Sequence, residues 1–356
     1  MYDEQDAREH LAMALDGKRL GRDAVIGLLE APGGAALGIC QSADTLRQRR
    51  VGDVVTYVAN RNINFTNVCT GSCLFCGYRR EEGYTLGLDE VRAKVQTPGI
   101  TEVCVQGGIN PSLDASYYFS LLETIKDERP DIHIHAFSPE EVTHLASLMG
   151  TSVRQTLVEL RRAGLGSMPG TAAEMLSDRV RALICPTKLS ASSWEAVITT
   201  AHNLGIRTTA TIMYGHVETR EERADHLLAL RRIQERTGGF TEFIPLTYMP
   251  GNELGRRYGL AGATGCDDLL MYAVSRLAFG ETIPNIQASW VKLGRKMAQV
   301  SLFCGANDMG GTLYEERISR ASGATHGESR SARDLEEMIL SVGRTPRQRT
   351  TLYGRV

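Results

Sequence analysis

The sequence of 356 residues lacks an excess of charge of either sign, since 40 Lys and Arg stand against 42 Asp and Glu. Its basic residues are scattered, so non-specific nucleic-acid binding has little support. It also lacks any run of about 18 apolar residues, which a membrane-spanning helix would need. The first thirty residues have no uninterrupted apolar segment of the kind found in a signal peptide. We therefore expect a cytoplasmic protein that binds neither membrane nor nucleic acid.

Cysteine is scarce, with eight residues in the chain, yet Cys69, Cys73 and Cys76 all fall within the segment NVCTGSCLFCGYRR. In a reducing compartment such a cluster is typical of a metal or catalytic site rather than of disulfides. Soft thiolates suit zinc and iron–sulfur clusters. A structural zinc site normally has four protein ligands, and the next cysteine, Cys104, lies in the middle of an expected strand. We therefore favour a CxxxCxxC loop that holds a [4Fe-4S] cluster and leaves one iron open. A zinc site and three purely structural cysteines remain as alternatives.

Short apolar segments alternate along the chain with amphipathic helical ones, which predicts a parallel sheet covered by helices. The expected strands span residues 55–65, 101–108, 131–138, 164–170, 208–215, 240–248, 285–290 and 300–308. No linker rich in Pro, Ser or Gly divides the chain, so we predict an α/β fold with a single (β/α)8 TIM-type barrel rather than two doubly wound domains. We place a helical extension at residues 1–50, the barrel at 51–320, and a C-terminal loop, helix and basic tail at 321–356.

Several expected strands end in glycine or polar residues, unlike their apolar middles. In a parallel barrel the carboxyl ends of the strands face one common cavity. The positions concerned are Gly107, Gly108, Ser138, Ser167, Tyr214, Gly215, His216, Asn307 and Asp308. They are therefore expected to converge on one site although they are far apart in the sequence.

The cysteine loop follows the first expected strand and carries Phe75 before its last cysteine, which resembles the radical S-adenosylmethionine (SAM) superfamily. In that superfamily the open iron binds the amino and carboxyl groups of SAM, and reduction cleaves SAM to methionine and a 5′-deoxyadenosyl radical. The glycine pair of VCVQGG has the position of the element whose backbone meets the methionyl amino group, although glycine pairs are also common in turns. The segment TIMYGHVET resembles the element that packs near adenine.

Longer segments narrow the resemblance to the second subunit of deazaflavin-precursor (FO) synthase. These segments are NINFTNVC, TEVCVQGGINP, HIHAFSPEE, PGTAAEML, TIMYGHVET, TGGFTEFIPL, IQASWVKLG and GANDMGGTLYEERISR. Membership implies that L-tyrosine is cleaved at its Cα–Cβ bond and that its 4-hydroxybenzyl group adds to 5-amino-6-(D-ribitylamino)uracil. It also implies that FO synthase subunit 1 acts next, and that a reductant such as ferredoxin or flavodoxin supplies the electron.

Within this resemblance each predicted site residue has an expected role. Metal ligands are Cys69, Cys73 and Cys76; cofactor contacts are Phe75, Tyr78, Gly107, Gly108, Ser167, Glu174 and Met213; substrate contacts are Ser138, Gln287, Ser289, Asn307 and Asp308; catalytic residues are His135 and His216.

Structural alternatives remain open for several of these site residues. Ser138 also suits a helix N-cap, and Asn307 with Asp308 suits a turn. His133 and His135 alternate on one strand and point to the same side, where either is also a plausible buried, satisfied histidine. Lys292 is either a solvated helix residue or a partner for a carboxylate.

The segment TYMPGNELGRRYG departs from the family pattern, which more often continues with a Val-His element at this point. Because it follows the sixth expected strand, at the site-facing end of the barrel, a paralogue with another acceptor remains open. So do the radical enzymes of the futalosine route to menaquinone, aminofutalosine synthase and dehypoxanthine futalosine cyclase. From a different class, a zinc-binding or iron–sulfur electron-transfer module is the alternative.

Overall fold

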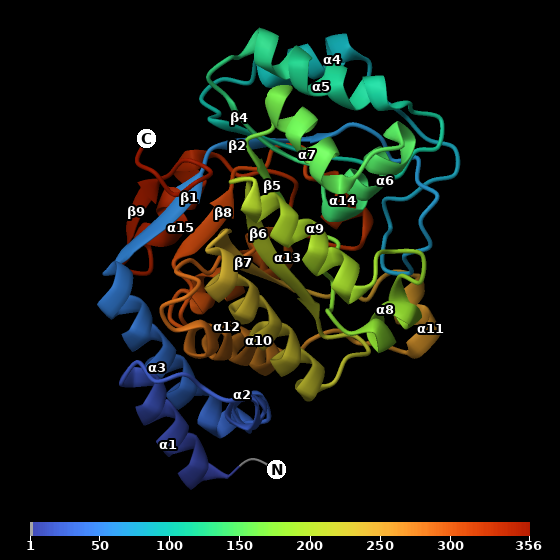
Figure 1. Cartoon of the computed structure of the whole chain (residues 1–356). Coiled ribbons are helices and arrows are strands. Elements are labelled where there is room, and N and C mark those ends of the chain that lie inside the picture. The colour runs from blue at the N-terminus through green and yellow to red at the C-terminus, as the bar shows by residue number, and fades with distance from the viewer. Residues whose placement is uncertain (1–2) are drawn as a thin grey trace.

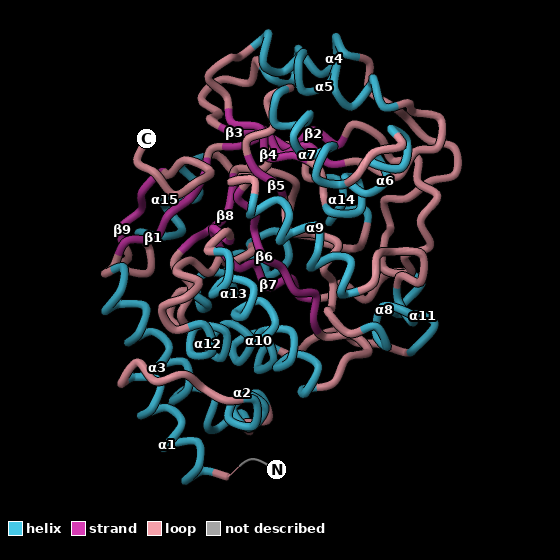
Figure 2. The backbone as a smooth tube through the Cα atoms, in the orientation of Figure 1, coloured by secondary structure: helices cyan, strands magenta, loops and turns pink. Residues whose placement is uncertain are grey.

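A curled parallel β-sheet surrounded by helices forms the centre of the molecule (Figures 1 and 2). The computed structural model describes residues 3–356. Six strands pair in sequence order, namely β2 (Asn60–Asn64), β3 (Glu102–Gln106), β4 (His133–Ala136), β5 (Ser167–Met168), β6 (Arg207–Tyr214) and β7 (Phe240–Thr247). A second parallel sheet has the order β8 (Asp308–Gly311), β1 (Val54–Val58) and β9 (Thr345–Gln348).

The two sheets join into a closed barrel. Only Ala59 separates β1 from β2, so the first strand runs from one sheet into the other. On the opposite side, isolated bridges pair Phe243 of β7 with Ile286, and Gln287 with Asp308 of β8. The residues between β7 and β8 therefore take the place of a further strand. The predicted (β/α)8 barrel is confirmed.

Two of the eight predicted strands differ in detail. Residues 285–290 supply only the two bridging positions and form no regular strand. Residues 300–307 were expected in the eighth strand, but they complete helix α13 (Trp290–Ser301) and a turn, and β8 begins only at Asp308. A short apolar run is compatible with a buried helix end as well as with a strand, so periodicity alone does not distinguish them.

Helices cover the outer face of the barrel. They are α4 (Leu88–Val95), α5 (Ala115–Glu128), α6 (Pro139–Met149), α7 (Val153–Arg162), α8 (Asp178–Ile184), α9 (Ala191–Asn203), α10 (Arg220–Thr237), α12 (Gly265–Phe279) and α13. Two short helices, α11 (Glu253–Tyr258) and α14 (Arg317–Ala321), lie instead against the segment that follows β2. Several begin with a capping box, in which a Ser or Thr hydroxyl and an acidic side chain three residues later satisfy the first free N–H groups. Ser138 and Glu141 form this box in α6, and Thr219 with Glu222 forms it in α10.

Three helices precede the barrel, α1 (Glu4–Leu15), α2 (Arg22–Leu29) and α3 (Gly33–Val51), and they pack on α10 and α12 (Figure 1). The C-terminal segment differs from the expected basic tail. After α15 (Ala332–Leu340), strand β9 pairs with β1 from Thr345 to Gln348, so these residues belong to the sheet. The residue that follows, Arg349, is thereby brought to the barrel interior.

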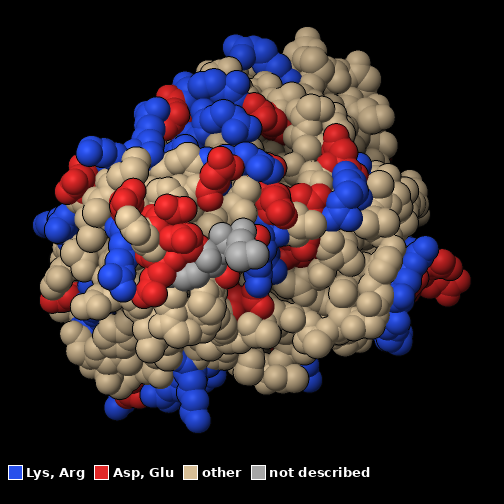
Figure 3. Space-filling view, turned by 90° about the horizontal axis from the view of Figure 1, so that it is seen from below, with Lys and Arg blue, Asp and Glu red and all other residues tan. Residues whose placement is uncertain are grey.

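Two clusters of buried apolar side chains hold the helices to the barrel. One joins β2–β5 to α4–α7 through residues such as Val103, Leu121 and Ile134, and the other joins the N-terminal helices to α10 and α12. On the face seen in Figure 3, acidic and basic side chains lie next to one another. No helix among residues 3–356 is both long enough and apolar enough to cross a bilayer.

Candidate active site

One cavity inside the barrel collects most of the predicted site residues. Its volume is about 400 Å³. The predicted residues that line it are Cys69, Cys73, Phe75, Cys76, Tyr78, Gly107, Gly108, His135, Ser138, Glu174, Met213, Gln287 and Ser289. The lining does not include Ser167, His216, Asn307 or Asp308. Of the strand-end positions expected to converge, Gly107, Gly108 and Ser138 line the cavity, whereas Ser167, Tyr214, Gly215, His216, Asn307 and Asp308 do not.

The loop after β2 brings its three cysteines to this cavity. The Cys69 thiol accepts hydrogen bonds from the backbone N–H groups of Gly71 and Ile109, each at 3.3 Å. At Leu74 the backbone N–H donates to the carbonyl of Ile184 at 2.9 Å, and the carbonyl accepts from Leu254 at 3.0 Å. The loop is therefore fixed on both sides, by the end of α8 and by α11.

The three thiols are not gathered into a preformed site for a single metal ion. Among residues 3–356, no three His, Cys, Asp or Glu side chains lie close enough together to hold one metal ion. The cysteines of an iron–sulfur cube each bind a different iron, so their sulfurs stand further apart than the ligands of a tetrahedral zinc. Burial raises the pKa of the Cys73 thiol to about 12, whereas binding to a metal would deprotonate it.

The glycine pair at the end of β3 packs against the cysteine loop. A Cβ on Gly108 would lie 2.2 Å from the carbonyl oxygen of Val68 and 2.8 Å from Cβ of Cys69. A Cβ on Gly107 would lie 2.4 Å from the ring of Phe65. The backbone at this strand end can approach its neighbours only because both residues are glycine.

A buried ion pair stands beside the cysteine loop. Nζ of Lys188 lies 2.7 Å from Oε1 of Glu174 and 5.5 Å from the ring centroid of Phe75. Burial lowers the pKa of Lys188, but the Glu174 carboxylate and the thiols of Cys73 and Cys185 shift it upward on balance. The pair is therefore charged. No sequence motif marks Lys188, which lies in an irregular loop after α8.

Charged residues from the barrel strands line the rest of the cavity, among them Glu102, Glu242 and Arg349. Arg349 donates to Asp308 at 2.5 and 3.1 Å and to Oε2 of Glu242 at 3.3 Å. Burial, more than the neighbouring Asp308, raises the pKa of Glu242 to about 7, although Arg349 opposes the shift. The sequence does not indicate Arg349, because it falls in the expected basic tail and reaches the barrel only through the pairing of β9 with β1.

Asp308 lies behind this network rather than in the cavity lining. Besides Arg349, it accepts hydrogen bonds from the Thr56 hydroxyl at 2.5 Å and from the backbone N–H of Gly310 at 2.7 Å. Its neighbour Asn307 accepts from Arg276 at 2.7 Å and from the backbone N–H of Ile286 at 2.9 Å. The structure therefore ties both side chains into the barrel wall instead of presenting them to a substrate.

The predicted histidines have different surroundings. The Ser167 hydroxyl lies 2.7 Å from Nε2 of His133 and 2.7 Å from Nδ1 of His135, so the two rings point to the same side as expected. Burial lowers the pKa of His135 to about 4, which keeps the ring neutral. The ring of His216 is held in its own turn, with Nε2 2.9 Å from the Met213 carbonyl and Nδ1 accepting from Val217 at 2.8 Å.

The atypical segment 247–259 contacts the cysteine loop directly. Tyr248, Met249 and Asn252 line the cavity. The Asn252 amide donates to the backbone carbonyl of Phe75 at 3.2 Å and accepts from the Tyr248 hydroxyl at 2.6 Å. This departure from the family pattern therefore lies within the site.

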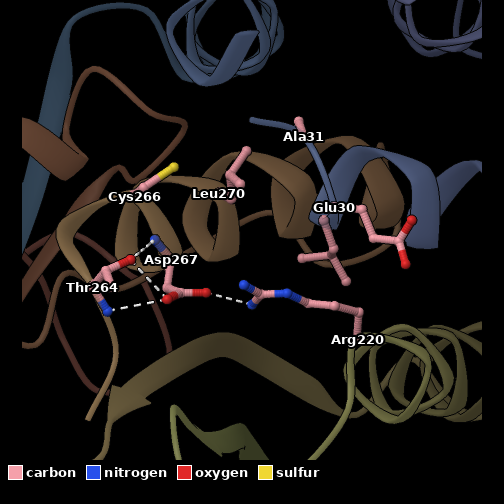
Figure 4. A pocket seen from close by; sticks show the side chains of 8 residues that line it. Glu30, Ala31, Arg220, Thr264, Cys266, Asp267 and Leu270 are labelled. Carbon is pink, nitrogen blue, oxygen red and sulfur yellow. Dashed lines mark hydrogen bonds and ion pairs between the residues drawn. The ribbon is translucent and has the colours of Figure 1, made fainter. Parts of the chain in front are cut away.

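A second cavity, of about 390 Å³, lies between the end of α2 and the first turns of α10 and α12 (Figure 4). Its lining includes Cys266 and shares no residue with the barrel cavity. Asp267 accepts hydrogen bonds from Thr264 and pairs with Arg220, so its charge is balanced (Figure 4).

Comparison with known proteins decides the family. A model described as "Radical SAM superfamily" matches residues 63–230, and one described as "CofH/MqnC C-terminal region" matches residues 237–355. A protein of Archaeoglobus fulgidus named 5-amino-6-(D-ribitylamino)uracil–L-tyrosine 4-hydroxyphenyl transferase is 54% identical over 316 residues, which are 88% of this chain and 92% of the relative. The chain belongs to this transferase family. A further member, from Methanosarcina acetivorans, is 52% identical over 96% of this chain and 92% of its own length.

Solved structures show the same fold as this transferase at low sequence identity. Methylornithine synthase (PylB) has a TM-score of 0.75 and 18% identity, with 95% of this chain and 97% of that chain covered. The [FeFe]-hydrogenase maturase HydG has a TM-score of 0.79 and 17% identity, with coverages of 99% and 78%. Membership of the radical SAM superfamily implies SAM and an iron–sulfur cluster, and the three thiols around the cavity agree with it.

Proposed function

We propose that this enzyme cleaves L-tyrosine at its Cα–Cβ bond and transfers the 4-hydroxybenzyl group to 5-amino-6-(D-ribitylamino)uracil. The other products would be 2-iminoacetate, methionine and 5′-deoxyadenosine. The observation that carries this proposal is one cavity in the barrel with three cysteines on one loop and polar side chains from the surrounding strands, in a chain 54% identical to a transferase of that name. The C-terminal family model names both CofH and MqnC, so that region alone does not select the substrate.

We assign the cluster site to Cys69, Cys73 and Cys76 and propose a [4Fe-4S] cluster with one iron free of protein ligands. Such a cluster supplies the electron that cleaves bound SAM and starts the radical reaction. On the protein side, Gly107 and Gly108 let the backbone approach the cofactor. The expected cofactor contacts Phe75, Tyr78, Glu174 and Met213 line the same cavity, which supports their assignment as a group.

The cavity must also exclude water during the reaction. A carbon radical attacks neighbouring C–H bonds, so the substrate must be held in one orientation and solvent must be excluded. Tyr78 is buried, its hydroxyl is hydrogen-bonded to that of Tyr84, and Asn252 fastens the atypical segment over Phe75. We propose that these contacts close the cofactor side of the cavity.

The ribityl chain and the uracil ring need several hydrogen-bonding partners. Ser138, Gln287 and Ser289 line the cavity and remain our proposed substrate contacts. The Asn62 side chain faces the same cavity with a buried Oδ1 that has no hydrogen-bond partner in the structure, and we add it as a contact. The neutral ring of His135 suits hydrogen bonding and proton transfer.

The residues outside the cavity lining receive supporting roles. Ser167 orients His133 and His135, and His216 fixes the turn after β6 to the carbonyl of Met213 near the end of that strand. We further propose that ferredoxin or flavodoxin supplies the electron and that FO synthase subunit 1 uses the product.

Anaerobic turnover tests the proposal. The protein with reconstituted cluster is incubated with a reductant, SAM and L-tyrosine, with and without the pyrimidine, and products are separated by liquid chromatography and mass spectrometry. We expect 5′-deoxyadenosine that depends on tyrosine, and a hydroxybenzyl adduct that requires both substrates. If a fully loaded sample forms neither, the proposed function is wrong.

A further inference from the structure

Lys292 presents a positive charge to the barrel cavity without a partner. It is partly buried and lines the cavity together with Ser289 and Val291. In the part of the chain that the structure describes, its ammonium group forms no hydrogen bond and no ion pair. The other lysine of the cavity, Lys188, is paired with Glu174 at 2.7 Å. Lys292 therefore has free donors that face the cavity, and a ligand that accepts hydrogen bonds from them would be stabilised there.

The backbone holds Lys292 in this position. Gly294 has φ +73°, a conformation that disfavours other residues, and it breaks α13 after its first turn. A Cβ at Gly294 would also lie 2.8 Å from the ring of His326. On the other side, the Trp290 indole donates to the Gly311 carbonyl at 2.9 Å. The turn that carries Lys292 is thus fixed to β8 at one end and released from the rest of the helix at the other.

The charges around Lys292 restrict what it can bind. Glu316 lines the cavity nearby, and it accepts the backbone N–H of Ser319 at 2.8 Å as the cap of α14. Burial lowers the pKa of Lys292. Glu316, Glu174 and the Cys76 thiol raise it by a smaller amount, so the net shift of the pKa is downward. With several other carboxylates in the lining, a polyanion such as a phosphate ester would be repelled. A single carboxylate suits the one unpaired ammonium group.

We propose that Lys292, assisted by the hydroxyl of Ser289 in the same cavity, binds the α-carboxylate of an amino-acid ligand, namely that of tyrosine. This inference rests on the proposed function, because the uncharged pyrimidine leaves only tyrosine and the methionyl part of SAM as carboxylate ligands. Lys188, beside the cysteine loop, stands on the cofactor side. Lys292 follows the segment of Gln287 and Ser289, which are proposed substrate contacts. A fixed carboxylate would orient the Cα–Cβ bond that is cleaved.

Binding measurements on the cluster-loaded full chain test this assignment. The dissociation constants of L-tyrosine, of tyramine, which lacks the carboxylate, and of SAM are measured by anaerobic equilibrium dialysis for the wild type, Lys292→Met and Lys292→Arg. Lys296→Met is the matched control, because Lys296 is exposed on the same helix. We expect Lys292→Met to weaken tyrosine binding by about 10- to 100-fold, the range of a charge-assisted hydrogen bond, with SAM and tyramine unchanged. Lys292→Arg should restore part of the affinity.

Steady-state kinetics, together with the outcomes that would contradict the assignment, distinguish a failure of this inference from a failure of the proposed function. Lys292→Met should raise the KM for tyrosine and leave that for the pyrimidine unchanged. If Lys292→Met binds SAM more weakly but tyrosine normally, Lys292 contacts the methionyl carboxylate of SAM and the assignment is wrong. Unchanged binding of both ligands by this variant would also overturn the assignment. Loss of both would indicate a structural role and overturn it as well. If Lys292→Met fails to fold, equal affinity of the wild type for tyrosine and tyramine would still refute it. A wild type without tyrosine-dependent turnover would instead refute the function.

Discussion

Glu141 connects the start of helix α6 to the glycine pair at the end of β3. Its Oε1 accepts a hydrogen bond from the backbone N–H of Gly107 at 2.9 Å, and its Oε2 accepts from the backbone N–H of Ser138 at 2.7 Å. The capping box that the sequence SPEE indicates for a helix thus also fixes the strand end expected to meet SAM. The family resemblance indicates only the glycine pair, and not Glu141, at this contact with SAM.

Glu141 makes the stability of the protein depend on pH. Burial raises its pKa from 4.5 to about 7. The native carboxyl keeps its proton over this interval while the unfolded one releases it, so its stabilising contribution is present below pH 4.5 and is lost as pH rises through about 7. Glu141→Gln removes this dependence. We expect the wild type to lose about 3 kcal/mol relative to this variant between pH 5 and pH 8 in urea unfolding. Glu123→Gln, on the exposed face of α5, should follow the wild type; a variant Glu141→Gln that does the same would contradict the shift.

Gly108→Ala should displace the cysteine loop, because the new Cβ would lie 2.2 Å from the Val68 carbonyl oxygen. The expected result is a reconstituted protein with much less iron per chain than the wild type, measured by colorimetric iron and sulfide assays. Gly38→Ala in α3 is the control, since no atom lies within 4 Å of its Cβ position, and it should keep its iron and gain about 0.5–1 kcal/mol of stability. Full iron loading of Gly108→Ala would show that the loop tolerates the shift.

Replacement of one cysteine tests the cluster itself. The reconstituted wild type should contain about four irons and as much sulfide per chain, and Cys73→Ala should lose most of both. The matched control is Cys266→Ala, since that thiol lies in the separate cavity of Figure 4 and should leave the iron content unchanged. One zinc per chain without sulfide would refute the iron–sulfur assignment.

The Arg349 network should be essential for stability. Arg349→Met would leave the buried carboxylates of Asp308 and Glu242 without their cation, which costs about 3–5 kcal/mol when one partner of a buried pair is removed. Arg347→Met removes an exposed arginine of strand β9, two residues before Arg349, and should have little effect. Equal urea midpoints for the two variants would mean that Arg349 is not the partner on which the carboxylates depend.

The sequence predicted the barrel and its cysteine loop because both have short-range signals. The alternation of apolar segments indicates parallel strands, and three thiols within eight residues indicate one centre. The side chains that complete the cavity have no such signal. Lys188 lies in an irregular loop, and Arg349 enters the barrel only because β9 pairs with β1, a long-range contact that periodicity does not reveal.

The expected convergence of strand ends holds only in part, because Gly107, Gly108 and Ser138 line the cavity and the other polar strand-end residues do not. Asn307 and Asp308 are turned into the wall by Arg276 and Arg349, which lie 31 and 41 residues away in the sequence. His216 is held by its own turn. Whether such a side chain faces the cavity depends on partners that only the folded chain brings together.

The fate of the tyrosine carbons tests the central claim most directly. L-tyrosine labelled with ¹³C at Cβ, and in a parallel sample at Cα, is converted by the anaerobic enzyme in the presence of SAM and 5-amino-6-(D-ribitylamino)uracil. Mass spectrometry then locates the label. Cleavage of the Cα–Cβ bond with transfer of the benzyl group predicts the Cβ label in the pyrimidine adduct and the Cα label in the two-carbon product. A Cα label in the adduct, or no labelled adduct from a cluster-loaded enzyme that cleaves SAM, would contradict the proposed reaction.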